Sequence, residues 1–110
     1  MVDGFLLVDK SRGWTSHDVV AKVRRLAGQK KVGHAGTLDP LASGLLPLLL
    51  GRATRLARFL PQSPKVYHGT FQLGWTSSTD DVCGEETSRH VGPLPEAARV
   101  LETARPFVGR

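Results

Sequence analysis

The sequence contains almost no cysteine and no long hydrophobic run, and both absences exclude classes of protein. Cys83 is the only cysteine, so an intrachain disulfide cannot form. Apolar runs such as residues 45–50 are far too short to cross a bilayer, and the first residues lack the basic segment and following apolar segment of a signal peptide. We therefore expect a cytoplasmic protein that has no membrane partner.

The residue groupings that hold metals, cradle phosphates or activate a serine are also missing. The histidines and Cys83 show neither Cys-x-x-Cys nor His-Glu-x-x-His spacing. The stretch 33–36 lacks the Gly-Lys-Ser/Thr ending of a phosphate-binding loop, and Ser43 lacks the Gly-x-Ser-x-Gly elbow. We expect no metal and no cofactor. The histidines are His17, His34, His68 and His90.

Acidic residues are scarce in the first two thirds of the chain. Residues 1–75 hold eleven Lys and Arg against four acids, a net charge of +7, whereas residues 76–110 carry −2, which gives the total of +5. A basic half favours a polyanionic partner, and nucleic acid fits better than membrane because no amphipathic helix combines basic residues with large aromatic anchors. The basic cluster in residues 22–31 and the stripe of Arg52, Arg55 and Arg58 fit phosphate contacts and solvent-facing charge equally well.

The first 64 residues show the patterns of strands and helices in alternation. The expected strands are residues 4–10 and 45–50, and the expected helices are residues 15–28 and 51–60, the second ended by Pro61-Gln62-Ser63-Pro64. Thr15 or Ser16 caps the first helix and Gly28 stops it. Pro47 argues against a central position for the strand 45–50, since proline cannot donate to a strand ladder.

The second part of the chain predicts one strand, one long loop and one helix. From Tyr67 to Trp75 apolar and polar positions alternate, which is the pattern of a half-buried strand. Residues 76–95 form a polar stretch that we expect to be a functional or mobile loop. Residues 94–104 repeat apolar positions at helical spacing up to Pro106, which should terminate that helix.

The stretch Gly33–Leu48 combines reactive side chains with glycines and prolines more densely than any other segment of the sequence. It contains Asp39 in an Asp-Pro pair among several glycines, so we expect a shaped loop that holds this carboxylate. A purely structural role is the alternative, because Asp-Pro commonly opens a turn in which the carboxylate bonds nearby backbone N–H groups.

Residues 33–47, Gly-His-Ala-Gly-Thr-Leu-Asp-Pro-Leu-Ala-Ser-Gly-Leu-Leu-Pro, resemble the central motif of the TruB-type pseudouridine synthases, the tRNA pseudouridine-55 synthases, whose relatives include the dyskerin family. Lys65-Val66-Tyr67 is similar to the Lys-x-Tyr of the family's next motif, and the entry to the first helix resembles its first motif. The resemblance implies an α+β fold with a mixed, largely antiparallel sheet and flanking helices, in which residues 1–110 form the N-terminal part of the catalytic domain. The resemblance further implies that the later catalytic half, with an Arg that pairs with the nucleophile, and the C-terminal RNA-binding domain lie outside these residues.

The resemblance also implies a reaction and the residues that perform it. Asp39 would be the nucleophile that isomerises a uridine in the T-arm loop of tRNA, Tyr67 would stack on the base and help to move a proton, and His34 would fill the vacated space. The implied substrate contacts are Lys65, Gly36, Thr37 and Leu38. We expect a monomer acting on tRNA. A non-catalytic RNA-binding fragment, or a fragment unable to fold by itself, are the alternatives.

Overall fold

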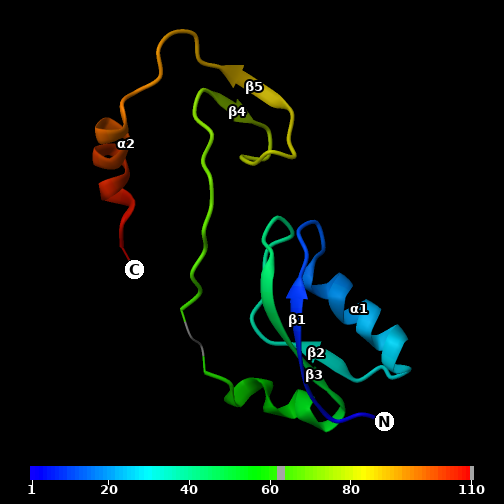
Figure 1. Cartoon of the computed structure of the whole chain (residues 1–110). Coiled ribbons are helices and arrows are strands. Elements are labelled where there is room, and N and C mark those ends of the chain that lie inside the picture. Colours follow the sequence, from blue (N-terminus) through cyan, green and yellow to red (C-terminus); the bar gives the residue numbers. More distant parts are fainter. Residues whose placement is uncertain (62–63, 110) are drawn as a thin grey trace. The chain divides into compact units, whose positions relative to one another are not determined.

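The computed structural model describes residues 1–61 and 64–109, which form two compact units, Met1–Lys65 and Val66–Arg110 (Figure 1). The elements of the first unit are β1 (Gly4–Lys10), α1 (Ser16–Ala27), β2 (Val32–His34), β3 (Gly44–Leu50) and a 3-10 helix, η1 (Gly51–Phe59). Those of the second are β4 (Trp75–Ser77), β5 (Glu86–Arg89), α2 (Ala97–Ala104) and a 3-10 helix, η2 (Arg105–Phe107). The chain is therefore the mixed α+β fold with antiparallel strands that the sequence predicts.

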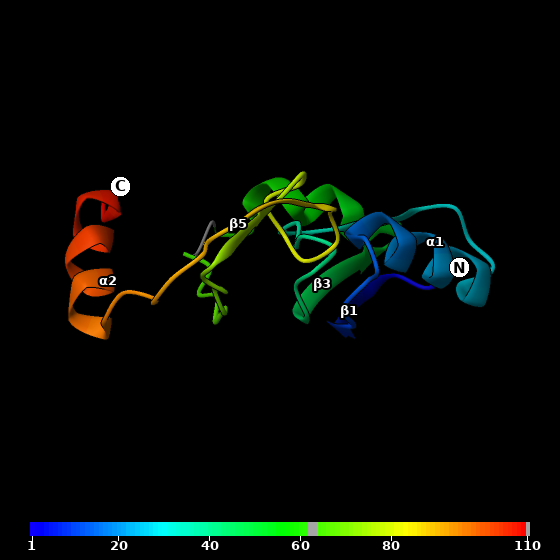
Figure 2. The ribbon, with the colours of Figure 1, turned by 90° about the horizontal axis from the view of Figure 1, so that it is seen from above.

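The first unit is built on a three-stranded antiparallel sheet in the order β1-β3-β2. Helix α1 covers one face of this sheet, and Figure 2 shows it alongside β1 and β3. The core between them consists of branched aliphatic side chains, which fit a pleated surface well. Its buried members are Val19, Val20, Val23, Val32, Leu46, Leu48 and Leu50.

Helix α1 begins and ends at the residues that the sequence predicts. Thr15 is the N-cap: its side chain accepts a hydrogen bond from the backbone N–H of Asp18, and the Asp18 carboxylate accepts one from the Thr15 N–H, both at 2.9 Å. This reciprocal pair is a capping box, which satisfies two backbone donors at the helix start. Gly28 closes the helix in the left-handed conformation, at φ 63°.

The sequence-based expectation that Pro47 keeps its strand out of the sheet centre is wrong, because β3 is the central strand. Pro47 lies opposite Leu7 of β1, and its carbonyl oxygen accepts a hydrogen bond at 2.9 Å from the Ala35 N–H, just beyond the end of β2. The N–H and C=O of one residue in an antiparallel strand point to the same neighbour. The missing N–H of Pro47 therefore faces Ala35, one residue beyond the last residue of β2, so the proline lies where this ladder ends rather than within it.

The predicted helix over residues 51–60 is present, but it is a 3-10 helix. Because side chains three positions apart eclipse in this geometry, Arg52, Arg55 and Arg58 lie on one exposed face. The helix ends at Phe59, with Leu60 as its C-cap. Gln62 and Ser63, which belong to the predicted stop signal, lie outside the described residues.

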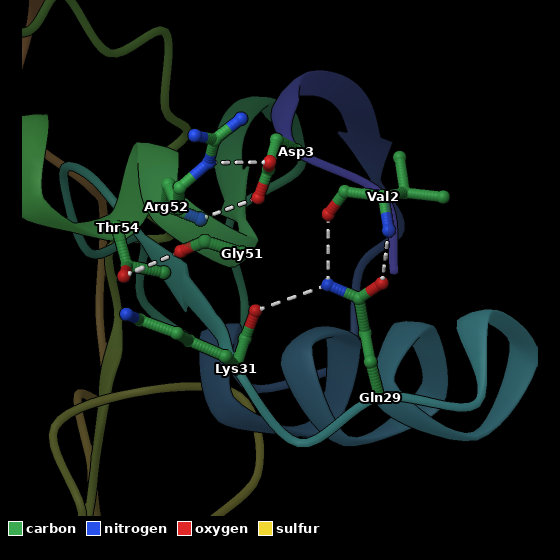
Figure 3. A network of polar contacts seen from close by, with 7 residues as sticks. All are labelled: Val2, Asp3, Gln29, Lys31, Gly51, Arg52 and Thr54. Carbon is green, nitrogen blue, oxygen red and sulfur yellow. Dashed lines mark hydrogen bonds and ion pairs between the residues drawn. The ribbon is translucent and has the colours of Figure 1, made fainter.

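A polar network connects the start of the chain to η1 and to the loop that follows α1 (Figure 3). The Asp3 carboxylate accepts hydrogen bonds from the backbone N–H of Arg52 at 2.6 Å and from its Nε at 2.7 Å. These contacts hold the pKa of Asp3 below its usual value. Gln29, just after α1, exchanges two hydrogen bonds with the backbone of Val2. The network thus fixes the strand β1 from its first residues.

The predicted strand from Tyr67 to Trp75 is wrong over most of its length. Residues 64–73 have no strand assignment, and β4 begins only at Trp75. A strand needs a neighbour that takes up its backbone N–H and C=O groups, and within the described residues no strand pairs with this segment. Apolar and polar side chains do alternate in this segment, but within the described residues no second strand accepts its backbone hydrogen bonds.

The polar stretch 76–95, which we expected to be a functional or mobile loop, instead contains a hairpin. Strands β4 and β5 pair antiparallel, with Trp75 opposite Arg89, and their side chains are mostly exposed. Within the turn, the Asp81 carboxylate accepts hydrogen bonds from the Thr79 hydroxyl and the Cys83 N–H, which lower its pKa. The predicted last helix is present as α2, and Pro106 lies just beyond it in η2.

Candidate functional site

Asp39 is presented at the head of a turn in the loop between β2 and β3. The Ala42 N–H donates a hydrogen bond to the Asp39 carbonyl oxygen at 3.0 Å, which closes a four-residue turn with Pro40 at its second position. Proline suits that position because its φ is fixed near the value that the turn requires. The Asp39 side chain is exposed. The shaped loop predicted from the sequence is therefore present.

The backbone before Asp39 is clamped by a buried side chain from the start of α1. The hydroxyl of Ser16 accepts a hydrogen bond from the Leu38 N–H and donates one to the Leu38 carbonyl oxygen, both at 3.0 Å. Ser16 is only 3% exposed, and the Leu38 side chain packs against the hydrophobic core. Both the polar and the apolar groups of Leu38 are thus fixed.

The backbone after Asp39 is held by the turn that follows β1. The carbonyl oxygen of Pro40 accepts hydrogen bonds from the Gly13 N–H at 2.7 Å and from Lys10 Nζ at 3.5 Å. The same ammonium donates to the carbonyl oxygens of Ser11 at 3.2 Å and Trp14 at 2.6 Å. Lys10 is 1% exposed, and a buried ammonium is tolerable only when its donors are used in this way.

Three of the predicted substrate contacts lie together on the other side of the loop. Lys65 Nζ donates a hydrogen bond to the Thr37 carbonyl oxygen. Gly36 has φ 77°, and a side chain there would begin 3.5 Å from Lys65 Cε. A glycine at this position therefore allows the left-handed backbone, whereas a Cβ there would make only an ordinary van der Waals contact with Lys65.

His34, Gly36, Leu38 and Lys65 line a hollow of about 1020 Å³ in the first unit. Its floor includes apolar side chains of β1 and β3 on the sheet face opposite α1, and Arg58 of η1 and the C-cap residue Leu60 also line it. The lining is mainly apolar and includes the polar side chains of His34, Arg58 and Lys65, a mixture that is typical of ligand sites. The apolar members from the sheet are Phe5, Leu7, Leu45 and Pro47.

The imidazole of His34 has a buried Nδ1 that finds no hydrogen-bond partner among the described residues. Within the described residues, that nitrogen therefore makes no hydrogen bond to the loop backbone. Similarly, no hydrogen bond to the Asp39 carboxylate is formed within residues 1–61 and 64–109, so the turn bonds of the structural alternative are not seen there.

The structure does not bring all predicted residues into this loop. Tyr67 belongs to the second unit, where it lies in the extended segment before β4 and is 55% exposed. Its role in the reaction stays a prediction. Sequence reasoning missed Lys10, Gly13 and Ser16 as the residues that hold the loop, although the resemblance of their segment to the family's first motif was a signal that it matters.

No grouping of three or more metal-ligating side chains occurs in the part of the chain that the structure describes. Among the helices described, none has the length and apolar character needed to cross a membrane. The candidate site consists of the Asp39 loop, the residues that hold this loop and the hollow beside it.

Comparison with known proteins shows the family. A family model described as TruB family pseudouridylate synthase (N terminal domain) matches residues 24–110. Over 90 residues the chain is 58% identical to tRNA pseudouridine synthase B of Solibacter usitatus (strain Ellin6076), covering 82% of this chain and 31% of that protein. Over 109 residues it is 50% identical to tRNA pseudouridine synthase B of Thermobifida fusca (strain YX), covering 99% and 37%. The chain belongs to the TruB family of pseudouridylate synthases.

A solved structure agrees with this assignment. A chain in a structure of an H/ACA RNP bound to a substrate RNA containing 2'-deoxyuridine is 47% identical, with a TM-score of 0.50 over 52% of this chain and 18% of that chain. The chain spans about a third of the length of the curated relatives described above. The family membership predicted from residues 33–47 is confirmed.

Proposed function

We propose that the protein isomerises uridine to pseudouridine in the T-arm loop of tRNA, at position 55, with Asp39 as the nucleophile. The observation that carries the proposal is the exposed Asp39, fixed at the head of a turn within a chain that is 50% identical over 109 residues to a tRNA pseudouridine synthase B. Residues 1–110 are the N-terminal part of its catalytic domain. The protein acts in the cytoplasm as a monomer.

The reaction needs one carboxylate and neither a redox cofactor nor a metal. The bond between ribose C1′ and uracil N1 breaks, the base turns, and C1′ is joined to C5; C5 loses a proton and N1 gains one, so that the atoms balance. An ionised Asp39 supplies the electron pair for the nucleophilic attack. Its exposure, and the lack of a hydrogen bond to its carboxylate within the described residues, leave the oxygens available for that attack.

The target uridine must leave its stack before Asp39 reaches it, which costs a few kcal/mol. Stacking on one aromatic ring, the role proposed for Tyr67, is worth about 1–3 kcal/mol. Stacking on one ring therefore only offsets the free-energy cost of extrusion, and further contacts must supply the remaining binding free energy. We assign them to His34, which fills the vacated space, to Lys65 and the backbone of residues 36–38, and to the arginines of η1 acting on phosphates.

The test is tritium release from a T-arm hairpin labelled at uridine C5, since C5 loses its hydrogen in the reaction. We expect release by the parent chain and a loss of at least about a hundredfold in Asp39→Asn, because the amide is no nucleophile. Asp9→Asn, which removes another exposed carboxylate of the first unit, is the control and should retain the parent rate. A loss smaller than about tenfold in Asp39→Asn would remove Asp39 from the nucleophile role.

A second candidate is RNA binding without catalysis. The exposed stripe of Arg52, Arg55 and Arg58 on η1, in the strongly basic part of the chain, favours it. Binding of the hairpin should then survive Asp39→Asn and weaken steeply with salt, because phosphate contacts release counterions. Hairpin binding with no tritium release from either chain would favour this candidate over catalysis.

A further inference from the structure

We infer that Ser16 is a positioning residue for Asp39, acting through the peptide groups on either side of Leu38. This inference rests on the proposed function, in which Asp39 is the nucleophile. Ser16 itself lies at the first position of α1 and reaches the loop across the fold, where its hydroxyl bonds both polar backbone groups of Leu38 at 3.0 Å. No other hydrogen bond to either group is formed within the described residues.

The hydroxyl is suited to this task because it is at once a donor and an acceptor. The Ser16 oxygen accepts a hydrogen bond from the Leu38 N–H, and its own O–H donates one to the Leu38 carbonyl oxygen. A single side chain thus holds both backbone groups of Leu38. The Leu38 carbonyl carbon is bonded to the nitrogen of Asp39, and Pro40 restricts the backbone on the other side. Ser16 therefore sets the direction from which the chain enters Asp39.

Ser16 has no competing task at the helix terminus. The capping bonds of α1 are made by Thr15 and Asp18, one position earlier and two positions later, and the Ser16 hydroxyl takes no part in them. Ser16 is also buried, so water does not substitute readily for its two bonds. Thr15→Ala thus weakens the same helix without touching the loop, and it is a matched control for Ser16→Ala.

The first measurement is amide hydrogen exchange of Leu38, with the buried Leu48 of β3 as a reference for the stability of the whole unit. In Ser16→Ala we expect Leu38 exchange to rise at least about tenfold more than Leu48 exchange, because only the loop loses its partner. In Thr15→Ala both amides should change by the same factor. Ser16→Cys fills nearly the same volume with a weak donor and should also release Leu38 selectively, which provides a second variant if Ser16→Ala does not fold.

The second measurement is kcat and KM for pseudouridine formation in the hairpin. Ser16→Ala should lower kcat by about tenfold or more and leave KM within about twofold, because a displaced nucleophile reacts slowly while the RNA contacts remain. Thr15→Ala should leave kcat unchanged below its unfolding temperature. Equal kcat values for the parent and Ser16→Ala would overturn the positioning role.

Failure of the proposed function is distinguishable from failure of this inference. If the parent chain forms no pseudouridine, the proposed function fails for this chain, and Leu38 exchange alone decides whether Ser16 holds the loop. If the parent is active and Ser16→Ala raises Leu38 and Leu48 exchange alike, the proposed function stands and the inference about Ser16 is wrong.

Discussion

At the scale of single residues, the polar groups buried near Asp39 decide how firmly its loop is held. Lys10 is the clearest case, since its ammonium is removed from solvent and donates to three carbonyl oxygens, those of Ser11, Trp14 and Pro40. A lysine next to a turn is normally an exposed residue in a sequence-based interpretation. Its burial depends on carbonyls that the fold brings together from two segments, and so the sequence alone does not predict it.

Replacing Lys10 by methionine should destabilise the first unit. The Lys10→Met side chain is of similar length but cannot donate, which leaves the carbonyls of Trp14 and Pro40 without this partner. We expect a loss of about 1–3 kcal/mol in the free energy of unfolding. Urea denaturation measures it, with the exposed Lys22→Met as control. Equal midpoints for the two variants would contradict the structural role of Lys10.

The contact between Asp3 and Arg52 should make stability depend on pH in the acid range. The hydrogen bonds from Arg52 lower the pKa of Asp3 in the folded chain, so the contribution of Asp3 is present above its ordinary pKa and is lost as the pH falls through the lower folded value. Asp3→Asn should therefore lower the urea midpoint at pH 7, and the difference from the parent should shrink below about pH 4. A difference that stays constant down to pH 2 would contradict this account.

At the scale of elements, those that carry their own local signal were predictable from the sequence. Helix α1 has Thr15 and Asp18 at its start and Gly28 at its end, and it formed between them. Strand β1 and the central loop around Asp39 were also found correctly. By contrast, residues 67–75 and the β4–β5 hairpin were assigned wrongly, because a strand is decided by pairing with another segment, which periodicity does not reveal.

The junction of β3 and η1 should tolerate only glycine. Gly51 has φ 60°, and a Cβ there would lie 2.0 Å from Asp3 Oδ1 and 2.7 Å from the Val2 carbonyl oxygen. Gly51→Ala should lower the free energy of unfolding by at least about 1–3 kcal/mol, from backbone strain alone. Gly33→Ala is the control, because no atom lies within 4 Å of its Cβ position. Similar urea midpoints for both variants would show that the close approach of Asp3 is not required.

At the scale of the whole molecule, the excess of basic residues and the candidate site lie in the same part of the chain. The first unit contains Asp39, the hollow beside it and the arginine stripe of η1, and the excess of basic residues lies before residue 76. The sequence predicted the loop through residues 33–47, and the substrate contacts that it assigned there and at Lys65 stay predictions. It did not predict the clamp on that loop, since Ser16 and Lys10 are generic residue types whose task appears only when α1 and β1 are packed.

The arginine stripe should contribute to RNA binding through charge. Arg55 is exposed and has no ion-pair partner in the described part of the chain, so Arg55→Gln should weaken hairpin binding and reduce the slope of log affinity against log salt by about 1. Fluorescence anisotropy over a salt series measures this slope. The control is Arg99→Gln, on α2 in the acidic part of the chain, which should leave the slope unchanged. Equal slopes for Arg55→Gln and the parent would exclude Arg55 from phosphate contact.

The central claim is that Asp39 of this chain converts uridine to pseudouridine, and the composition of the RNA product tests it most directly. A T-arm hairpin is incubated with the parent or with Asp39→Asn, digested to nucleosides, and separated by chromatography with mass detection. We expect the parent to convert one uridine to a nucleoside of the same mass that keeps its bond between sugar and base on fragmentation, and we expect Asp39→Asn to convert none. Equal conversion by both chains would contradict the role of Asp39, and no conversion by the parent would contradict the proposed activity of this chain.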